Sequence, residues 1–445
     1  MINTRTTASS FRKTTLAAAL ALAAGASSAQ TATEAELARK VDRLAAELAE
    51  LKVQLLQLQQ QRAVTPLAAN APAPAPAPAS AAAVAVAPAN GPPGASSEPA
   101  TVLSSYGEIN YNRPTNARQN TQVDLRRFVL GYQHRVDPAT KIVAELEVEH
   151  AVASRSDPGE VEIEQAYVER QLNRIWAVRG GLLLMPAGLL NENHEPTAYF
   201  GVERNFVETA IIPTTWREGG FQLIGNFDNG LTLQTGISTG FDLTKWDAAS
   251  SEGAESPLGS IHQELVLAKA RDLAIFGALN WRGIPGLLLG GSLFTGGATH
   301  GQATANARVT LWDLHARWNP GRWDLSALYS RGTISNTAAL NAPLVGNATL
   351  IPKSFDGWYT QAAFKLWTSG DYVLSPFARW EKFNTGRSYA DLGPGLTPAS
   401  RPTERVATVG ANLQVGSGLV LKADVQRFRE NSSLNRFNLG LGWSF

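Results

Sequence analysis

The chain has 445 residues, with 39 basic and 38 acidic side chains and no cysteine. The near-neutral net charge argues against a nucleic-acid partner. The lack of cysteine excludes disulfides, thiol catalysis and cysteine-ligated metals. After the first 30 residues, no apolar stretch reaches the roughly 20 residues that a membrane-spanning helix needs, so a helical membrane protein is excluded as well.

Residues 1–29 have the pattern of a secretory signal peptide. Basic residues, including Arg12 and Lys13, precede a short apolar stretch at residues 16–24, and small residues follow it. The stretch is too short to cross a bilayer as an anchor. We therefore expect an exported protein whose mature chain begins near Gln30.

Residues 30–62 predict a coiled-coil helix, because leucine and valine recur at alternating steps of four and three residues. A single helix of this length is marginal in water, which favours self-association in two or three copies. Packing of the helix on the rest of its own chain is the alternative. The predicted oligomerisation residues are Leu37, Val41, Leu44, Leu48, Leu51, Leu55 and Leu58.

Residues 63–100 are a predicted linker. They consist mostly of Ala, Pro, Gly and Ser, with alternating Ala and Pro from residue 71 to residue 78. Such a segment cannot bury a core, and it extends by about 3.1 Å per residue as a semi-rigid spacer. The linker therefore separates the predicted helix from everything that follows.

Residues 101–445 predict an all-β domain, because polar and apolar residues alternate in many short stretches. In residues 141–149, for example, Ile142, Leu146 and Val148 alternate with charged residues such as Glu145 and Glu147. One face of such a strand is apolar and the other polar. This pattern fits both a soluble sandwich and a barrel with a lipid-facing exterior and a wet lumen.

The lengths of the connections favour the barrel. Short turns are expected around residues 137–139, 172–174, 228–230, 283–285, 319–321, 368–370 and 416–418. Between them, longer connections are expected around residues 113–114, 156–158, 190–215, 242–263, 297–304, 332–352, 385–402 and 430–433. Short turns at one end and long loops at the other are typical of outer-membrane barrels, and the spacing predicts about 16 antiparallel strands.

Aromatic residues support the same interpretation. Five tryptophans lie beside the expected short turns, where a barrel has an interfacial aromatic belt, although Trp312 and Trp380 fall in mid-strand. The last strand alternates apolar residues up to a final phenylalanine, which resembles the signal recognised by the outer-membrane assembly machinery. The belt residues are Trp176, Trp281, Trp318, Trp323 and Trp367, and the assembly-signal residues are Phe437, Leu439, Leu441, Trp443 and Phe445.

The first third of this domain resembles the phosphate-selective porin O and P family. The resemblance rests on residues 125–132, 142–147, 165–170, 179–180, 186–189, 203–204 and 217–220, together with the final Phe. It implies a trimer of 16-stranded barrels, each narrowed by an inward-folded third loop, and it implies passage of anions such as phosphate. The segment that matches this loop, residues 190–215, departs from the family because it carries more Glu than Arg and no Lys.

Two groups of residues are candidates for lining the lumen. For Arg204 and Arg217, a basic face opposite the acidic strands is one interpretation, and pairing of Arg204 with Glu203 or Glu208 is the other. The acidic strands themselves are either a salt-bridged wall or a wall that favours cations. The constriction candidates are His194, Glu195, Glu203, Arg204, Glu208 and Arg217; the wall candidates are Arg127, Arg135, Glu145, Glu147, Glu149, Glu160, Glu162, Glu164 and Arg179.

The sequence thus predicts an outer-membrane porin of a Gram-negative bacterium for small polar solutes or ions. Six scattered histidines offer no metal site and no nucleophile–base pair, so we expect no enzyme activity, no metal and no cofactor. Expected partners are the bilayer with its lipopolysaccharide, the barrel assembly machinery and further copies of the chain in a homotrimer. An envelope-tethering barrel whose N-terminal helix reaches the cell wall is the alternative function.

Overall fold

The computed structural model describes residues 100–445. The predicted signal peptide, the predicted coiled coil and all but the last residue of the predicted linker lie outside the described residues. Within the described part, no helix combines the length and the apolar character needed to span a bilayer. The fold is therefore described from the start of the first strand onward.

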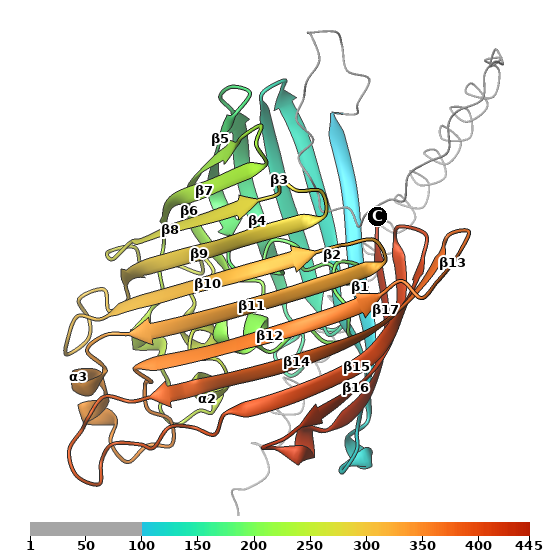
Figure 1. Cartoon of the computed structure of the whole chain (residues 1–445). Coiled ribbons are helices and arrows are strands. Elements are labelled where there is room, and N and C mark those ends of the chain that lie inside the picture. Colours follow the sequence, from blue (N-terminus) through green and yellow to red (C-terminus); the bar gives the residue numbers. More distant parts are fainter. Residues whose placement is uncertain (1–99) are drawn as a thin grey trace, which may run out of the picture. The chain divides into compact units, whose positions relative to one another are not determined.

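One antiparallel sheet contains all the strands of the described residues (Figure 1). Their alternating composition and the turn residues between them explain why the chain forms strands here. The strands are β1 Thr101–Pro114, β2 Gln122–Asp137, β3 Thr140–Glu149, β4 Val161–Gln171, β5 Trp176–Leu184, β6 Arg217–Asn226, β7 Leu231–Ser238, β8 Ala274–Trp281, β9 Leu287–Gly297, β10 Arg308–Trp318, β11 Trp323–Ile334, β12 Ser354–Phe364, β13 Trp367–Ser369, β14 Tyr372–Ser388, β15 Glu404–Val415, β16 Leu419–Phe428 and β17 Arg436–Ser444.

The sheet closes on itself. Each strand pairs with its sequence neighbour, and β1 also pairs with β17, from Tyr106 opposite Ser444 to Pro114 opposite Arg436. β12 and the short β13 follow one another along β14, so the 17 strands occupy sixteen positions around the barrel. The prediction of a 16-stranded antiparallel barrel is therefore confirmed.

The two faces of the wall differ in polarity, as the alternation predicted. Large apolar side chains such as Leu130, Ile142, Leu314 and Val409 point outward and are exposed. The polar positions between them point into the lumen, where Glu147 and Arg127 are buried. A closed sheet with an apolar exterior satisfies all backbone hydrogen bonds without water, as hydrocarbon requires.

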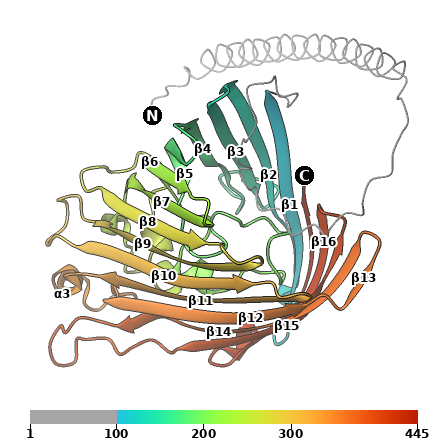
Figure 2. The same ribbon diagram turned by 45° about the horizontal axis from the view of Figure 1, so that its top comes forward.

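The connections alternate as expected, with short turns at one end of the barrel and long loops at the other (Figures 1 and 2). Every predicted short turn and every predicted long connection lies at a junction between consecutive strands, although residues 113–114 still belong to the end of β1. All short helices of the described residues lie in the long connections: η1 Arg118–Asn120, η2 Val207–Ile211, η3 Leu243–Lys245, α2 Glu252–Glu255, η4 Gly259–Ile261, α3 Thr337–Asn341, η5 Ala342–Leu344 and η6 Ser432–Leu434.

The predicted aromatic belt lies at the short-turn end. Trp318, Trp323 and Trp367 border short turns and are each exposed by nearly half. Trp176 begins β5 and Trp281 ends β8, so both also border short turns. Amphipathic indole rings are stable at a membrane interface, so a belt at one end is the arrangement expected of a membrane barrel.

An apolar core lies inside the barrel, near the long-loop end. Val207 and Ile211 of the β5–β6 connection pack with Phe241 and Trp246 of the β7–β8 connection. The same core includes Ile351 of the β11–β12 connection and wall residues of β9 to β12. These loops therefore fill part of the lumen instead of extending from it.

Closure of the sheet can be tested with a disulfide between β1 and β17. Asn112 and Asn438 are directly opposed, and their side-chain amides hydrogen-bond at 2.8 Å. Because the chain has no cysteine, the double variant Asn112→Cys/Asn438→Cys should form one intramolecular disulfide, which is measured as a mobility shift on a non-reducing gel. The control variant Asn112→Cys/Asn412→Cys, whose second cysteine lies on β15, should form no disulfide. A disulfide in this control variant but not in Asn112→Cys/Asn438→Cys would contradict the closure.

Candidate functional site

The β5–β6 connection, residues 185–216 and here called L3, crosses the lumen. It leaves the wall at β5, and its helix η2 contacts β11, β12 and β14. Further along the wall, the Val202 N–H donates to Asp424 of β16 at 2.7 Å, and the Tyr199 hydroxyl donates to Glu108 of β1 at 2.9 Å. L3 is therefore bound to strands on both sides of the barrel, and Figure 2 shows it inside the ring of strands.

Glu208 is the main internal anchor of L3. Its carboxylate accepts hydrogen bonds from the Leu189 and Leu190 N–H groups at 2.6 and 2.8 Å. It also accepts from the Asn205 amide at 2.7 Å and from the Tyr359 hydroxyl of β12 at 3.0 Å. Burial raises the pKa of Glu208, and these donors oppose the rise. A predicted constriction residue thus holds the loop in place and does not face open lumen.

Glycine is required where L3 passes this carboxylate. Gly188 has φ 69°, in the left-handed region that L side chains rarely adopt. A Cβ at this position would clash with Glu208 Oε1. The Pro186-Ala187-Gly188 sequence therefore suits a tight turn whose backbone N–H groups reach the buried carboxylate.

Strand β14 binds the middle of L3 through an ion-paired arginine and glutamate. Arg379 of β14 pairs with Glu381 at 2.6 Å and donates to the backbone oxygens of Glu203 and Arg204 at 3.3 Å. Glu381 accepts from the Phe206 N–H at 2.6 Å. The backbone of L3, rather than its charged side chains, thus makes these contacts with β14.

Neither prediction for Arg204 is correct. Its guanidinium donates to the Thr214 and Thr215 hydroxyls at 2.5 and 2.9 Å and to the backbone oxygen of His194 at 3.3 Å. It is buried, so it forms no basic face, and Glu203 accepts from Asn112 instead. Arg204 therefore joins the middle of L3 to its last residues, Thr214 and Thr215.

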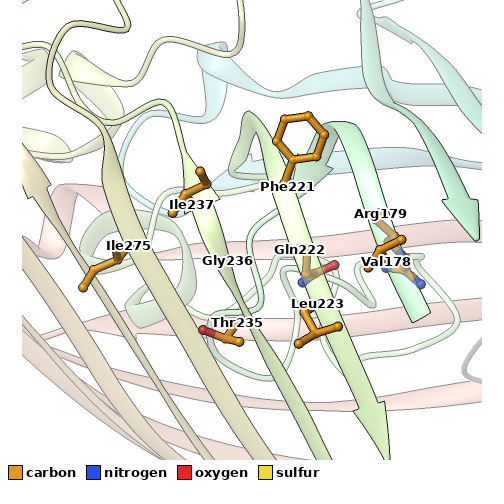
Figure 3. Close-up of a pocket in the computed structure, with 9 residues that line it drawn as sticks. All are labelled: Val178, Arg179, Phe221, Gln222, Leu223, Thr235, Gly236, Ile237 and Ile275. Atoms are coloured by element: carbon orange, nitrogen blue, oxygen red, sulfur yellow. The ribbon is translucent and has the colours of Figure 1, made fainter. Parts of the chain in front are cut away.

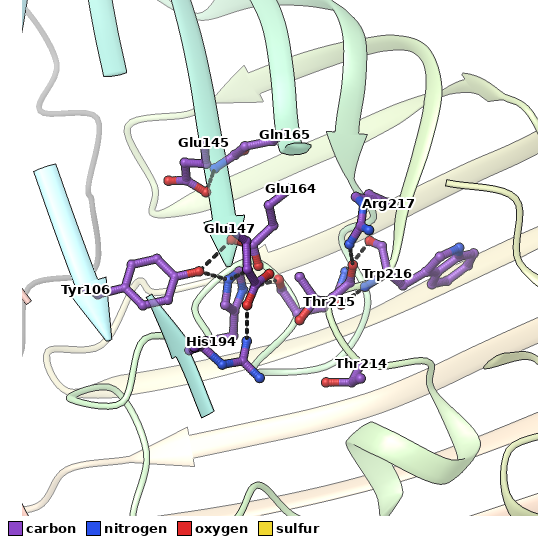
Figure 4. A network of polar contacts seen from close by, with 12 residues as sticks. Tyr106, Glu145, Glu147, Glu164, Gln165, His194, Thr214, Thr215, Trp216 and Arg217 are labelled. Atoms are coloured by element: carbon purple, nitrogen blue, oxygen red, sulfur yellow. Dashed lines mark hydrogen bonds and ion pairs between the residues drawn. The ribbon is translucent and has the colours of Figure 1, made fainter. Parts of the chain in front are cut away.

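His194 links L3 to the wall (Figure 4). Its Nε2 lies 2.7 Å from Glu164 of β4 and 2.7 Å from the hydroxyl of Tyr106 on β1, and that hydroxyl donates to Glu164 at 2.6 Å. Its Nδ1 donates to the backbone oxygen of Asn191 at 2.9 Å. The buried Glu164 carboxyl therefore contacts both the imidazole of L3 and the phenol of β1.

Five carboxyl groups occupy lumen-facing positions of β3 and β4 and are here called the acidic wall: Glu145, Glu147, Glu149, Glu162 and Glu164. Glu147 is directly opposite Glu162 in the β3–β4 ladder, an arrangement that destabilises a sheet unless cations are near. Arg127 of β2 lies 3.4 Å from Glu147. Arg217 pairs with Glu162, so the expectation that Arg217 faces this wall from across the lumen is wrong. Glu160 precedes β4 and is exposed.

Basic residues lie on the same wall, nearer to the short-turn end of the barrel. Arg179 of β5 and Lys141 of β3 both pair with Glu169, at 2.6 and 3.2 Å. Arg135 of β2 lies opposite Lys141 in the β2–β3 ladder. The predicted wall residue Arg179 therefore faces the lumen but is separated from the acidic wall by its own partner.

Glu195 of L3 adds to the acidic wall. Burial raises the pKa of Glu195, which the nearby Glu164 carboxylate raises further and His194 lowers. Glu195 and Glu145 are close enough to interact electrostatically. Of the six predicted constriction residues, the structure therefore brings His194, Glu195 and Arg217 to this wall, whereas Glu203, Arg204 and Glu208 lie elsewhere in L3.

A cavity of about 520 Å³ lies in a different place, against β5 to β8 (Figure 3). Its lining includes Phe221, Ile237 and Ile275, which are exposed on the outward side of the wall. The cavity is therefore a feature of the apolar exterior and not part of the lumen. Across residues 100–445, no group of three or more His, Asp or Glu side chains is arranged to hold a metal ion.

Comparison with known proteins identifies a fold and no family. No family model matches the chain. An uncharacterised protein of Aquifex aeolicus (strain VF5) is 26% identical over 355 residues, which cover 77% of this chain and 79% of that protein.

The solved structure of Salmonella typhi OmpF in complex with daunomycin is 12% identical, with a TM-score of 0.54, and covers 78% of this chain and 97% of OmpF. The outer membrane channel DcaP of Acinetobacter baumannii, also 12% identical, covers 78% of this chain and 97% of its own, with a TM-score of 0.48. The chain therefore has a porin-like fold, while membership of the phosphate-selective family stays a prediction.

Several residues that hold the site were missed by the sequence analysis. Tyr106, Glu108, Arg379, Glu381 and Asp424 all contact L3 or its partners. Each occupies a lumen-facing position in an alternating strand, which is the one signal the sequence offers. That signal marks the face of the wall but not the partner, because the partner depends on the path of a 32-residue loop.

Removing the anchor should release L3. Glu208→Ala leaves four buried donors without an acceptor, at roughly 1–3 kcal/mol for each unsatisfied group. We expect a lower unfolding temperature, and a larger channel conductance as L3 leaves the lumen, measured by heat-dependent gel mobility and planar-bilayer recording. Thr209→Ala, in the same helix but half-buried, is the control. Unchanged stability and conductance in Glu208→Ala would show that Glu208 does not anchor L3.

Proposed function

We propose that the protein is an outer-membrane porin through which small polar solutes or ions diffuse passively. The observation that carries this proposal is a closed 16-stranded barrel crossed by an inward-folded loop. About 16 strands enclose an aqueous channel, whereas about eight enclose only side chains. L3 narrows such a channel, and the partly exposed polar residues beside it, Glu145 and Arg179 among them, leave a wet surface.

The proposal includes no catalytic step. The buried cluster of His194, Glu164 and Tyr106 brings together groups that occur in active sites, but each of them has a structural partner. The cluster fixes L3 to β1 and β4 and is almost inaccessible to solute. Lumen groups therefore act on a permeating solute through charge and hydrogen bonding alone.

Location and assembly follow from the same reasoning. The apolar exterior and the belt of tryptophans support insertion in an outer membrane, beside lipopolysaccharide, by the barrel assembly machinery. A homotrimer is the assembly that the family resemblance implies. In the alternative proposal, the barrel is an envelope tether whose predicted N-terminal helix contacts the cell wall.

Purified protein reconstituted in a planar bilayer should produce discrete conductance steps. A water-filled lumen conducts ions whatever its selectivity, so steps are expected in KCl without any added substrate. Current is recorded at several voltages of both signs, with detergent alone as the control. Membranes that stay silent at every voltage, although the protein is inserted and folded, would exclude the porin.

Deletion of residues 30–100 separates the two proposed functions. A porin formed by residues 101–445 should keep its step conductance without them. A tether would lose its attachment to the cell wall, which is measured by co-sedimentation of the barrel with purified peptidoglycan. Loss of conductance in a folded deletion variant would count against a pore formed by the barrel alone.

A further inference from the structure

The position of L3 leaves one side of the lumen accessible to water. Lumen-facing residues of β14 to β17 are buried beneath L3, including Arg379, Asp424 and Asn438. On β3 and β4, Glu145, Gln165 and Tyr167 keep partial exposure. A solute passing L3 therefore meets Glu145 and the polar residues beside it, whereas Glu147 and Glu164 of the acidic wall are buried.

The basic residues beside the acidic wall are already paired with carboxyl groups. Arg127 lies between Glu108, at 3.0 Å, and Glu147, at 3.4 Å. Arg217 pairs with Glu162 and, at 2.9 Å, with Glu264 of the β7–β8 connection. Each arginine is thus shared between two carboxyl groups, and Glu264 also lies 3.1 Å from the His262 Nδ1.

Two carboxyl groups where L3 meets the wall, Glu145 of β3 and Glu195 of L3, form no ion pair. Glu145 accepts a hydrogen bond from the Gln165 amide at 2.6 Å. Among residues 100–445, neither Glu145 nor Glu195 forms an ion pair; the two interact electrostatically with each other and with Glu164, and His194 is the one basic group that acts on both. Carboxyl groups therefore outnumber basic groups at the one place where L3 and the water-accessible wall meet.

A second observation also indicates a missing cation. Glu147 is 1% exposed, and its Oε1 accepts no hydrogen bond from any described residue. Arg127 is its nearest cation, and Arg127 donates its Nε–H to Glu108 instead. A buried carboxylate oxygen without a donor is costly, and Glu147 therefore leaves negative charge on β3 that Arg127, shared with Glu108, does not balance.

We propose that the pore selects cations, and that Glu145 and Glu195 are the residues that set this selectivity. The inference rests on the proposed function, because it needs an open channel. The permeating class is small cations, both inorganic ions and organic ammonium ions, whose charge replaces the missing basic partners. Anions such as phosphate meet excess negative charge at the same place.

The test is the reversal potential of the channel in a KCl gradient. Wild-type protein should show a cation-selective reversal potential. Glu145→Gln/Glu195→Gln should lower the ratio of cation to anion permeability several-fold, and Glu145→Lys should favour anions. Glu252→Gln makes the same charge change on the exposed helix α2 and should leave the ratio unaltered.

Outcomes for this inference and for the porin proposal are distinguishable. A conducting channel that prefers chloride, or a folded double variant that keeps the wild-type permeability ratio, overturns the cation selectivity and leaves the porin intact. Absence of any conductance overturns the porin itself. Tetramethylammonium chloride in place of KCl extends the measurement to an organic cation. A channel that passes potassium but excludes tetramethylammonium would restrict the permeating class to inorganic cations.

Discussion

The structure depends on one constraint, which is that every strand must find a hydrogen-bonding partner on both sides. In hydrocarbon an unpaired backbone group costs several kcal/mol, so an open sheet edge is not tolerated. The ladder between β1 and β17 removes the last two edges. Once the ring of sixteen positions closes, its diameter is fixed, and that diameter is too large for wall side chains to fill the interior.

L3 fills part of the interior that closure of the barrel creates. Its apolar residues Val207 and Ile211 join a core with β9 to β12. Its polar backbone is bound by Arg379, Glu381 and Asp424 of the wall. Buried charge is tolerated there because each carboxylate accepts hydrogen bonds from donors of the loop. The acidic wall differs, because Glu147 and Glu145 lack a comparable set of donors.

Local features were predictable from sequence. Turn residues such as Asp228-Asn229-Gly230 and the tryptophans beside them carry their information within a few residues, and strand alternation assigned Glu145 and Arg127 to the lumen. The sequence could not predict that Arg204 binds Thr214 and Thr215. That contact depends on where L3 turns back, and the turn is fixed by Glu208 meeting Tyr359, a residue 151 positions away. Long-range packing, rather than residue type, decided which charged groups of L3 face water.

The path of L3 also explains why its own composition says little about selectivity. Its first part, with His194 and Glu195, faces β3 and β4, whereas Glu203, Arg204 and Glu208 face the far wall or the loop itself. Of the charged side chains that the loop contributes, few remain beside the water-accessible surface. In the proposed pore, the charge that a solute meets is therefore set mainly by the β3–β4 hairpin. L3 affects that charge by burying other parts of the wall and leaving Glu145 on β3 partly exposed.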